Sequence, residues 1–195
     1  MTMVGSSTDH VPSPEPTPEM SRQVDVRSLP REPVEIVADR GERQALARRF
    51  DLVRIDRLYA KAEIKADGGT IEMLGELRAQ IVQRCVVSAE DVPADIATRV
   101  HLRFVPEADF AAMLAGQEAE DADIGPGFEI ESDDCDTLPY RGGVIDLGEA
   151  IAQTLALEID PYPEGPNADK VRAELGLDAP EPTGPFAALK ALKKD

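Results

Sequence analysis

The fold is decided by residues 57–105, which read RLYAKAEIKADGGTIEMLGELRAQIVQRCVVSAEDVPADIATRVHLRFV. Small or apolar residues recur there at every second position, which is the period of a β-strand with one buried face. The dipeptide Asp67-Gly68 favours a tight hairpin turn, and a second turn falls at residues 88–91. The stretch therefore predicts a three-stranded antiparallel meander.

The first turn also predicts a pairing register. A two-residue loop at Asp67-Gly68 places Ala66 opposite Gly69 and Ile64 opposite Ile71. The same register pairs further residues of one face, namely Ala62 with Met73, Ala60 with Gly75 and Leu58 with Leu77. The inner face then continues through Ala79, Ile81, Cys85, Val92, Ala94, Ile96, Thr98, Val100, Leu102 and Phe104.

Two main helices are predicted, one before the meander in the sequence and one after it. Asp39 and Glu42 have the spacing of a capping box, so we expect a helix over residues 42–50. Asp146 and Glu149 repeat this spacing before a helix expected over residues 147–159. The shorter predicted elements are strands near 24–29, 34–38 and 140–145, helical segments at 109–114 and 170–175, and a last short helix from residue 185.

These elements predict one α+β domain over residues 21–163. Its curved antiparallel β-sheet is open or closes toward a barrel, and the two main helices pack on its apolar face. Residues 1–20 hold four prolines among small and acidic residues and predict a disordered tail. Residues 117–136 form an acidic loop, and residues 164–195 form a polar segment that ends in a short amphipathic helix.

Composition limits the partners. The chain has 195 residues, with 38 acidic residues against 21 Lys and Arg, and a net charge of −17. Such a charge opposes non-specific binding to nucleic acid or anionic membranes, so any RNA contact must be local. Aromatic residues make up 4% of the chain, which argues against a base-stacking sheet. Without an apolar run of about 18 residues or a secretion signal, we expect a cytoplasmic protein that does not bind membranes.

No catalytic, metal or cofactor site is predicted. Phosphate-loop, Gly-x-Ser-x-Gly and His-Glu-x-x-His motifs are missing from the sequence, and two cysteines cannot build a four-cysteine zinc site. His101 and Cys85 fall on opposite faces of the predicted sheet, so they cannot act together. The acidic stretch from Asp121 does not fit a calcium loop, because Ser132 occupies the twelfth position, where a Glu belongs.

The outward face of the meander reverses the sign of the charge. Seven Lys and Arg side chains face four acidic ones there. This face is either an ordinary mixed-charge surface or a local patch for RNA phosphates. The candidate RNA-binding residues are Arg57, Lys61, Arg78, Arg84, Arg99, His101 and Arg103.

A second candidate surface is acidic. Residues 117–136 carry nine acidic residues and no basic one, which is typical of a solvated loop or of a docking segment for a basic protein. The candidate partner-binding residues are Glu118, Glu120, Asp121, Asp123, Asp133 and Asp134, together with the apolar stripe Phe186, Leu189 and Leu192.

Three blocks, residues 83–88, 143–149 and 155–163, resemble the YceD family of large ribosomal RNA subunit accumulation proteins. The resemblance implies a role in the accumulation of bacterial 23S ribosomal RNA, without an established enzymatic activity. Many members have a Cys-x-Arg-Cys motif and later cysteines. Here Val82 stands at the first of these positions and residues 163–167 lack cysteine, so metal binding is not carried over.

The expected function is therefore a non-catalytic factor in the biogenesis of the large ribosomal subunit. Its expected partner is ribosomal RNA or a pre-ribosomal particle, bound directly or indirectly. One alternative is an acidic holding module for a basic ribosomal protein, and another is an RNA-processing enzyme.

Overall fold

The computed structural model describes residues 18–121 and 136–176. Its strands are β1 (Gln23–Asp25), β2 (Val34–Val37), β3 (Arg54–Asp67), β4 (Thr70–Arg84), β5 (Asp91–Pro106), β6 (Asp136–Tyr140) and β7 (Val144–Asp146). Its helices are α1 (Arg40–Arg49), α2 (Glu107–Asp121), α3 (Leu147–Glu158) and α4 (Ala168–Leu175). None of the helices within these ranges is long and apolar enough to cross a membrane.

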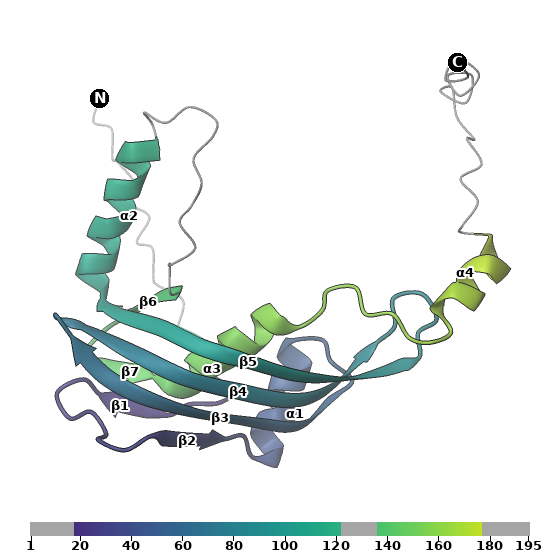
Figure 1. Cartoon of the computed structure of the whole chain (residues 1–195), viewed down its shortest axis with the longest axis horizontal. Coiled ribbons are helices and arrows are strands. Elements are labelled where there is room, and N and C mark those ends of the chain that lie inside the picture. Colours follow the sequence, from purple (N-terminus) through teal and green to yellow (C-terminus); the bar gives the residue numbers. More distant parts are fainter. Residues whose placement is uncertain (1–17, 122–135, 177–195) are drawn as a thin grey trace, which may run out of the picture.

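The main sheet has five strands in the order β2-β3-β4-β5-β6. The first four are antiparallel neighbours, whereas β6 runs parallel to β5. Figure 1 shows a curved, open sheet with α1 and α3 behind it; we call the face toward the viewer the outer face. The predicted α+β class with a curved, mostly antiparallel sheet is confirmed. Of the two predicted forms, the sheet is the open one and does not close into a barrel, and β6 adds one parallel pairing.

The predicted register is wrong by two residues. The turn residues of the β3–β4 hairpin are Gly68 and Gly69, and Asp67 pairs with Thr70. Both glycines have positive φ angles, of 52° and 99°, as a tight hairpin turn requires of its two central residues. Glycine adopts such angles without a steric cost, which moves the turn from Asp67-Gly68 to Gly68-Gly69.

The predicted division into faces is nevertheless correct, because a shift of two residues preserves the alternation of side chains. Ile64, for example, now pairs with Met73, and both are buried. The predicted inner-face residues of β4 and β5 are likewise buried or half-buried. Gly75 lies in the middle of β4, where an added Cβ would come within 2.2 Å of the backbone oxygen of Lys61. Strands β3 and β4 can therefore approach closely only because residue 75 is glycine.

Helix α1 begins with the predicted capping box. The Glu42 amide donates to the Asp39 carboxylate at 2.8 Å, and the Asp39 amide donates to the Glu42 carboxylate at 2.8 Å. Asp146 caps α3 as expected, but Glu149 does not reach back to it. The Glu149 carboxylate instead forms an ion pair with Arg49 of α1 at 2.8 Å, because α1 and α3 lie on the same side of the sheet. This pair joins the two main helices.

Two short elements pair away from the main sheet. Strand β1 pairs with β7, and the Asp146 carboxylate accepts hydrogen bonds from the Ser21 hydroxyl at 2.5 Å and the Arg22 amide at 2.8 Å. Met20, which the sequence places in the disordered tail, is only 1% exposed and belongs to the core. The packed domain therefore includes residue 20, one residue before the expected boundary.

Helix α2 is longer than predicted and stands away from the sheet at the end of β5 (Figure 1). The sequence predicts a helix over residues 109–114, followed by an acidic loop from residue 117. The observed helix continues to Asp121, because residues 107–121 are mostly good helix formers and contain no proline. Asp136, at the other end of the predicted loop, begins β6.

One edge of β5 is open along part of its length in the described structure. Hydrogen-bonded and non-hydrogen-bonded residue pairs alternate along β4 and β5. The Cys85 amide donates to the Glu90 oxygen at 2.8 Å, so the hydrogen-bonded positions of β5 are the even-numbered ones. The backbone groups of the odd-numbered residues from Pro93 to His101 consequently point away from β4. Strand β6 begins opposite Leu102, so within the described ranges no strand pairs with residues 93–101 on that side.

Candidate nucleic-acid interface

The structure places the seven candidate RNA-binding residues on β3, β4 and β5, with their side chains on the outer face or at its end. Six are exposed and Arg103 is half-buried. No described helix covers this face in Figure 1. The residues thus share one surface, as the sequence predicts.

Three of the seven side chains are held by acidic neighbours. Lys61 lies 3.4 Å from Glu35 of β2, and Arg78 lies 3.0 Å from Glu76. The His101 ring nitrogen Nε2 lies 3.0 Å from the Glu72 carboxylate. These side chains are less available to a phosphate, because a ligand must replace an existing partner.

The other four candidates, Arg57, Arg84, Arg99 and Arg103, form no ion pair within 4 Å with the described residues. Arg99 lies opposite Glu76 in the sheet, but Arg78 takes that carboxylate. A free guanidinium offers paired N–H donors that match a phosphate group. These four residues are the strongest candidates on the outer face.

Two further acidic side chains weaken this patch. Strand pairing puts Glu35 beside Lys61, and Asp91 lies opposite Arg84 at the end of the hairpin. Counting both reduces the local excess of basic over acidic side chains from three to one. The reversal of charge on the outer face is therefore smaller than the sequence predicts.

A second basic surface was missed by the sequence analysis. Arg40, Arg43 and Arg48 of α1 and Arg54 of β3 line one hollow of about 710 Å³, which we call the arginine groove. Helical spacing could have indicated this surface, since positions 40, 43 and 48 lie on one side of α1, but the predicted helix begins only at residue 42. Strand alternation alone does not predict this surface, because three of its four arginines lie on a helix.

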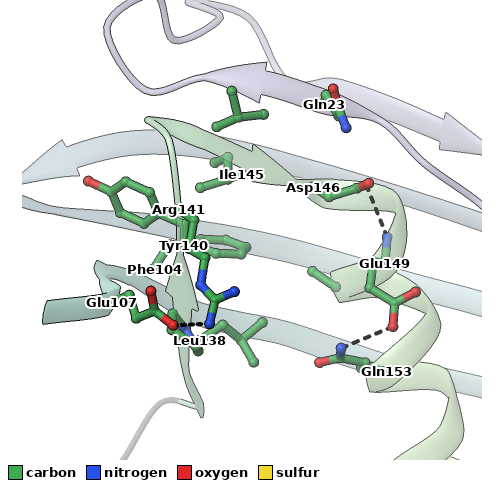
Figure 2. A pocket seen from close by; sticks show the side chains of 13 residues that line it. Gln23, Phe104, Glu107, Leu138, Tyr140, Arg141, Ile145, Asp146, Glu149 and Gln153 are labelled. Atoms are coloured by element: carbon green, nitrogen blue, oxygen red, sulfur yellow. Dashed lines mark hydrogen bonds and ion pairs between the residues drawn. The ribbon is translucent and has the colours of Figure 1, made fainter. Parts of the chain in front are cut away.

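Another hollow, of about 510 Å³, lies between the end of β5, β6, β7 and α3 (Figure 2). Phe104, Leu138 and Ile145 contribute to its apolar lining. Its polar side chains bond to one another: Glu107 pairs with Arg141, and Glu149 accepts from Gln153 at 3.0 Å. This internal pairing leaves the hollow poorly suited to a charged ligand.

The acidic and C-terminal candidates are placed only in part. Glu118, Glu120 and Asp121 belong to the last turns of α2, and the structure describes their backbone. The remaining candidates, Asp123, Asp133, Asp134, Phe186, Leu189 and Leu192, lie outside the described residues. A binding role for any of them stays a prediction.

Comparison with known protein families matches residues 73–193 to the family described as "Large ribosomal RNA subunit accumulation protein YceD". This match covers more than half of the chain. The chain belongs to the YceD family. Searches of the curated proteins and of the solved structures found no match.

The YceD match divides the two basic surfaces. It contains Arg78, Arg84, Arg99, His101 and Arg103 of the outer face, whereas Arg57 and Lys61 of that face precede the matched segment. The arginine groove, at residues 40–56, also precedes the matched segment.

Cys85 lies where the β4–β5 turn meets the segment after α3. Its side chain is buried, while His101 is exposed on the other face, as predicted. Hydrogen bonds from the backbone of Gly165, followed by Ser88, lower the pKa of the Cys85 thiol to about 7. The Val86 amide also donates to the Pro163 oxygen at 3.0 Å, and the Asn167 amide donates to the Glu90 carboxylate at 3.0 Å, so residues 163–167 pack on the turn. No group of three or more His, Cys, Asp or Glu within the described ranges could hold a metal ion.

Proposed function

We propose that this YceD-family protein is a non-catalytic factor in the accumulation of 23S ribosomal RNA and in the biogenesis of the large ribosomal subunit. The observation that carries the proposal is the family match over residues 73–193. The free arginines of the outer face support it, because they offer phosphate contacts on a chain whose charge otherwise repels RNA. The protein acts in the cytoplasm, on ribosomal RNA or a pre-ribosomal particle.

The proposal is tested in cells of the source organism that lack the protein. The ratio of 23S to 16S ribosomal RNA should fall and should return to normal when the parent chain is supplied. An unchanged ratio in the deletion strain would contradict the proposed function. Purified protein should leave 23S ribosomal RNA intact, and sustained cleavage that co-purifies with the protein would favour the RNA-processing alternative.

Two matched variants test the role of the outer face. Arg84→Gln, Arg99→Gln and Arg103→Gln together remove three free guanidinium groups. Lys61→Gln, Lys65→Gln and Arg78→Gln together remove the same charge from side chains that already have acidic partners. We expect the first variant to restore the 23S ratio less well than the second. Equal restoration by both variants would argue against phosphate contacts by the free arginines.

A second proposal is that the protein holds a basic ribosomal protein, and the net charge of −17 supports it. Deletion of residues 118–135 should then abolish capture of the basic protein, whereas the outer-face variants should have little effect. If RNA contact is the function, the deletion should instead strengthen RNA binding, because it removes negative charge.

A further inference from the structure

The arginine groove is strongly basic. Its lining contains four arginines and a single acidic residue, Asp56. The other lining residues are Gln44, Ala47, Leu52, Val53 and Ile55. The outer face, by contrast, has an excess of only one basic side chain. A hollow with this charge, on a chain of −17, focuses positive potential at one place.

The three arginines of α1 that line the groove have no carboxylate partner among the described residues. Arg40 and Arg48 are exposed and form no hydrogen bond or ion pair through their side chains with the described residues. The Arg43 guanidinium donates through Nη1 to the backbone oxygen of Ala38 at 2.7 Å, which holds that group at the start of the helix and leaves its other N–H donors without a carboxylate partner among the described residues. Arg54 lies 3.0 Å from Asp56 and 3.8 Å from Asp91. Three guanidinium groups on one helix are therefore not neutralised by a carboxylate.

The backbone sets the spacing of these groups. Positions 40, 43 and 48 lie on the side of α1 that faces the start of β3, and they extend over about 12 Å of helix axis. Buried Leu52 and Ile55 form part of the floor and hold the two elements together. A row of this length can contact more than one phosphate of a strand. The lining contains no aromatic ring on which a base could stack.

We infer that the arginine groove binds the phosphodiester backbone of RNA, with little preference for base sequence. Arginine presents paired N–H donors that match two phosphate oxygens, and each neutralised phosphate releases counterions from the RNA. The choice of RNA rests on the proposed function, but the surface differs from the outer face. The groove also lies outside the segment matched to the family.

The inference is tested by fluorescence anisotropy with the full chain and a labelled 12-nucleotide oligouridylate. Arg40→Gln and Arg48→Gln together, and the triple variant that adds Arg43→Gln, should weaken binding. The triple variant should lose about tenfold in affinity at 50 mM salt and flatten the slope of log K against log salt by about two. The double variant keeps the hydrogen bond from Arg43 to Ala38. If both variants bind the oligouridylate more weakly, unfolding of the first turn of α1 is therefore not the cause.

A matched control removes the same charge elsewhere. Arg27→Gln, Arg31→Gln and Lys170→Gln together alter exposed side chains that do not line the groove. This control should bind the oligouridylate within about twofold of the parent, because distant exposed charges are largely screened. Equal losses in the control and the groove variants would overturn the inference, as would unchanged binding by both groove variants. Loss confined to the outer-face variant would also overturn it.

The cellular assay separates failure of this inference from failure of the proposed function. If the deletion strain loses 23S ribosomal RNA and the groove variant restores it fully, the proposed function stands and the inference fails. If the deletion strain keeps a normal 23S ratio, the proposed function fails whatever the groove binds. The expected result is a loss in the deletion strain with partial restoration by the groove variant.

Discussion

Replacement of Leu155 by alanine tests whether α3 closes the core. Leu155 is completely buried in the cluster that joins α3 to the sheet. Truncation of a fully buried leucine costs about 2–5 kcal/mol, and we expect about 3 kcal/mol for Leu155→Ala. For a domain of this size, that loss corresponds to a fall in Tm of about 10 °C. The variant should remain folded, because small domains have a stability of about 5–15 kcal/mol.

The helix itself provides the control. Leu157 lies two positions later in α3 and is 76% exposed. Leu157→Ala should therefore change the free energy of unfolding by less than about 0.5 kcal/mol. Urea unfolding followed by circular dichroism measures both variants, provided that the slope of the transition stays constant. Equal losses for Leu155→Ala and Leu157→Ala would refute the placement of α3 against the sheet.

Four further results are expected from the core and the turns. Leu155→Asp should unfold the domain, because it adds an unpaired charge to the lost packing; a cooperative thermal melt like that of the parent would contradict this. Asp146→Ala should cost about 2–3 kcal/mol in urea unfolding, because it removes a helix cap and two bonds to residues 21 and 22. Gly75→Ala should lower the free energy of unfolding by about 1–3 kcal/mol in the same assay, because its Cβ meets a neighbouring backbone. The pKa of Cys85 is about 7 in the folded chain and higher in the unfolded chain, so the thiolate stabilises the fold. The free energy of unfolding of the parent, relative to that of Cys85→Ala, should therefore increase from pH 7 to pH 9. Below pH 7 this difference should no longer depend on pH. A difference in urea midpoint between the two that stays constant from pH 6 to pH 9 would argue against a thiolate at this turn.

Strand alternation explains why the faces of the meander could be predicted. Whether a side chain lies on the inner or the outer face depends only on whether its position in the strand is odd or even. The inner-face assignment of Ile64 and Met73 therefore survives a register error of two residues. The register itself depends on the φ angles of the turn, and the sequence Asp67-Gly68-Gly69 offers two choices for the pair of turn residues. Both capped helices were also predictable, because the signal for a cap is local.

Long-range pairing accounts for what the sequence could not provide. Glu149 has two competing partners, and only the packing of α1 beside α3 favours Arg49 over the capping position. The parallel pairing of β6 with β5 spans more than thirty residues and has no local signal. The arginine groove likewise depends on how α1 packs beside the start of β3, because three of its arginines lie on the helix and Arg54 lies on the strand.

The open edge of β5 has a consequence for the behaviour of the protein at high concentration. Unpaired strand edges are templates on which a second molecule can add its own strand and start an aggregate. Here Pro93 offers no N–H donor at one end of the exposed row, and β6 occupies the edge from Leu102 onward at the other. A copied β5 strand would meet β6 before it could pair along its length. Sequence and topology thus limit self-association at this edge, in addition to the repulsion between chains of like charge.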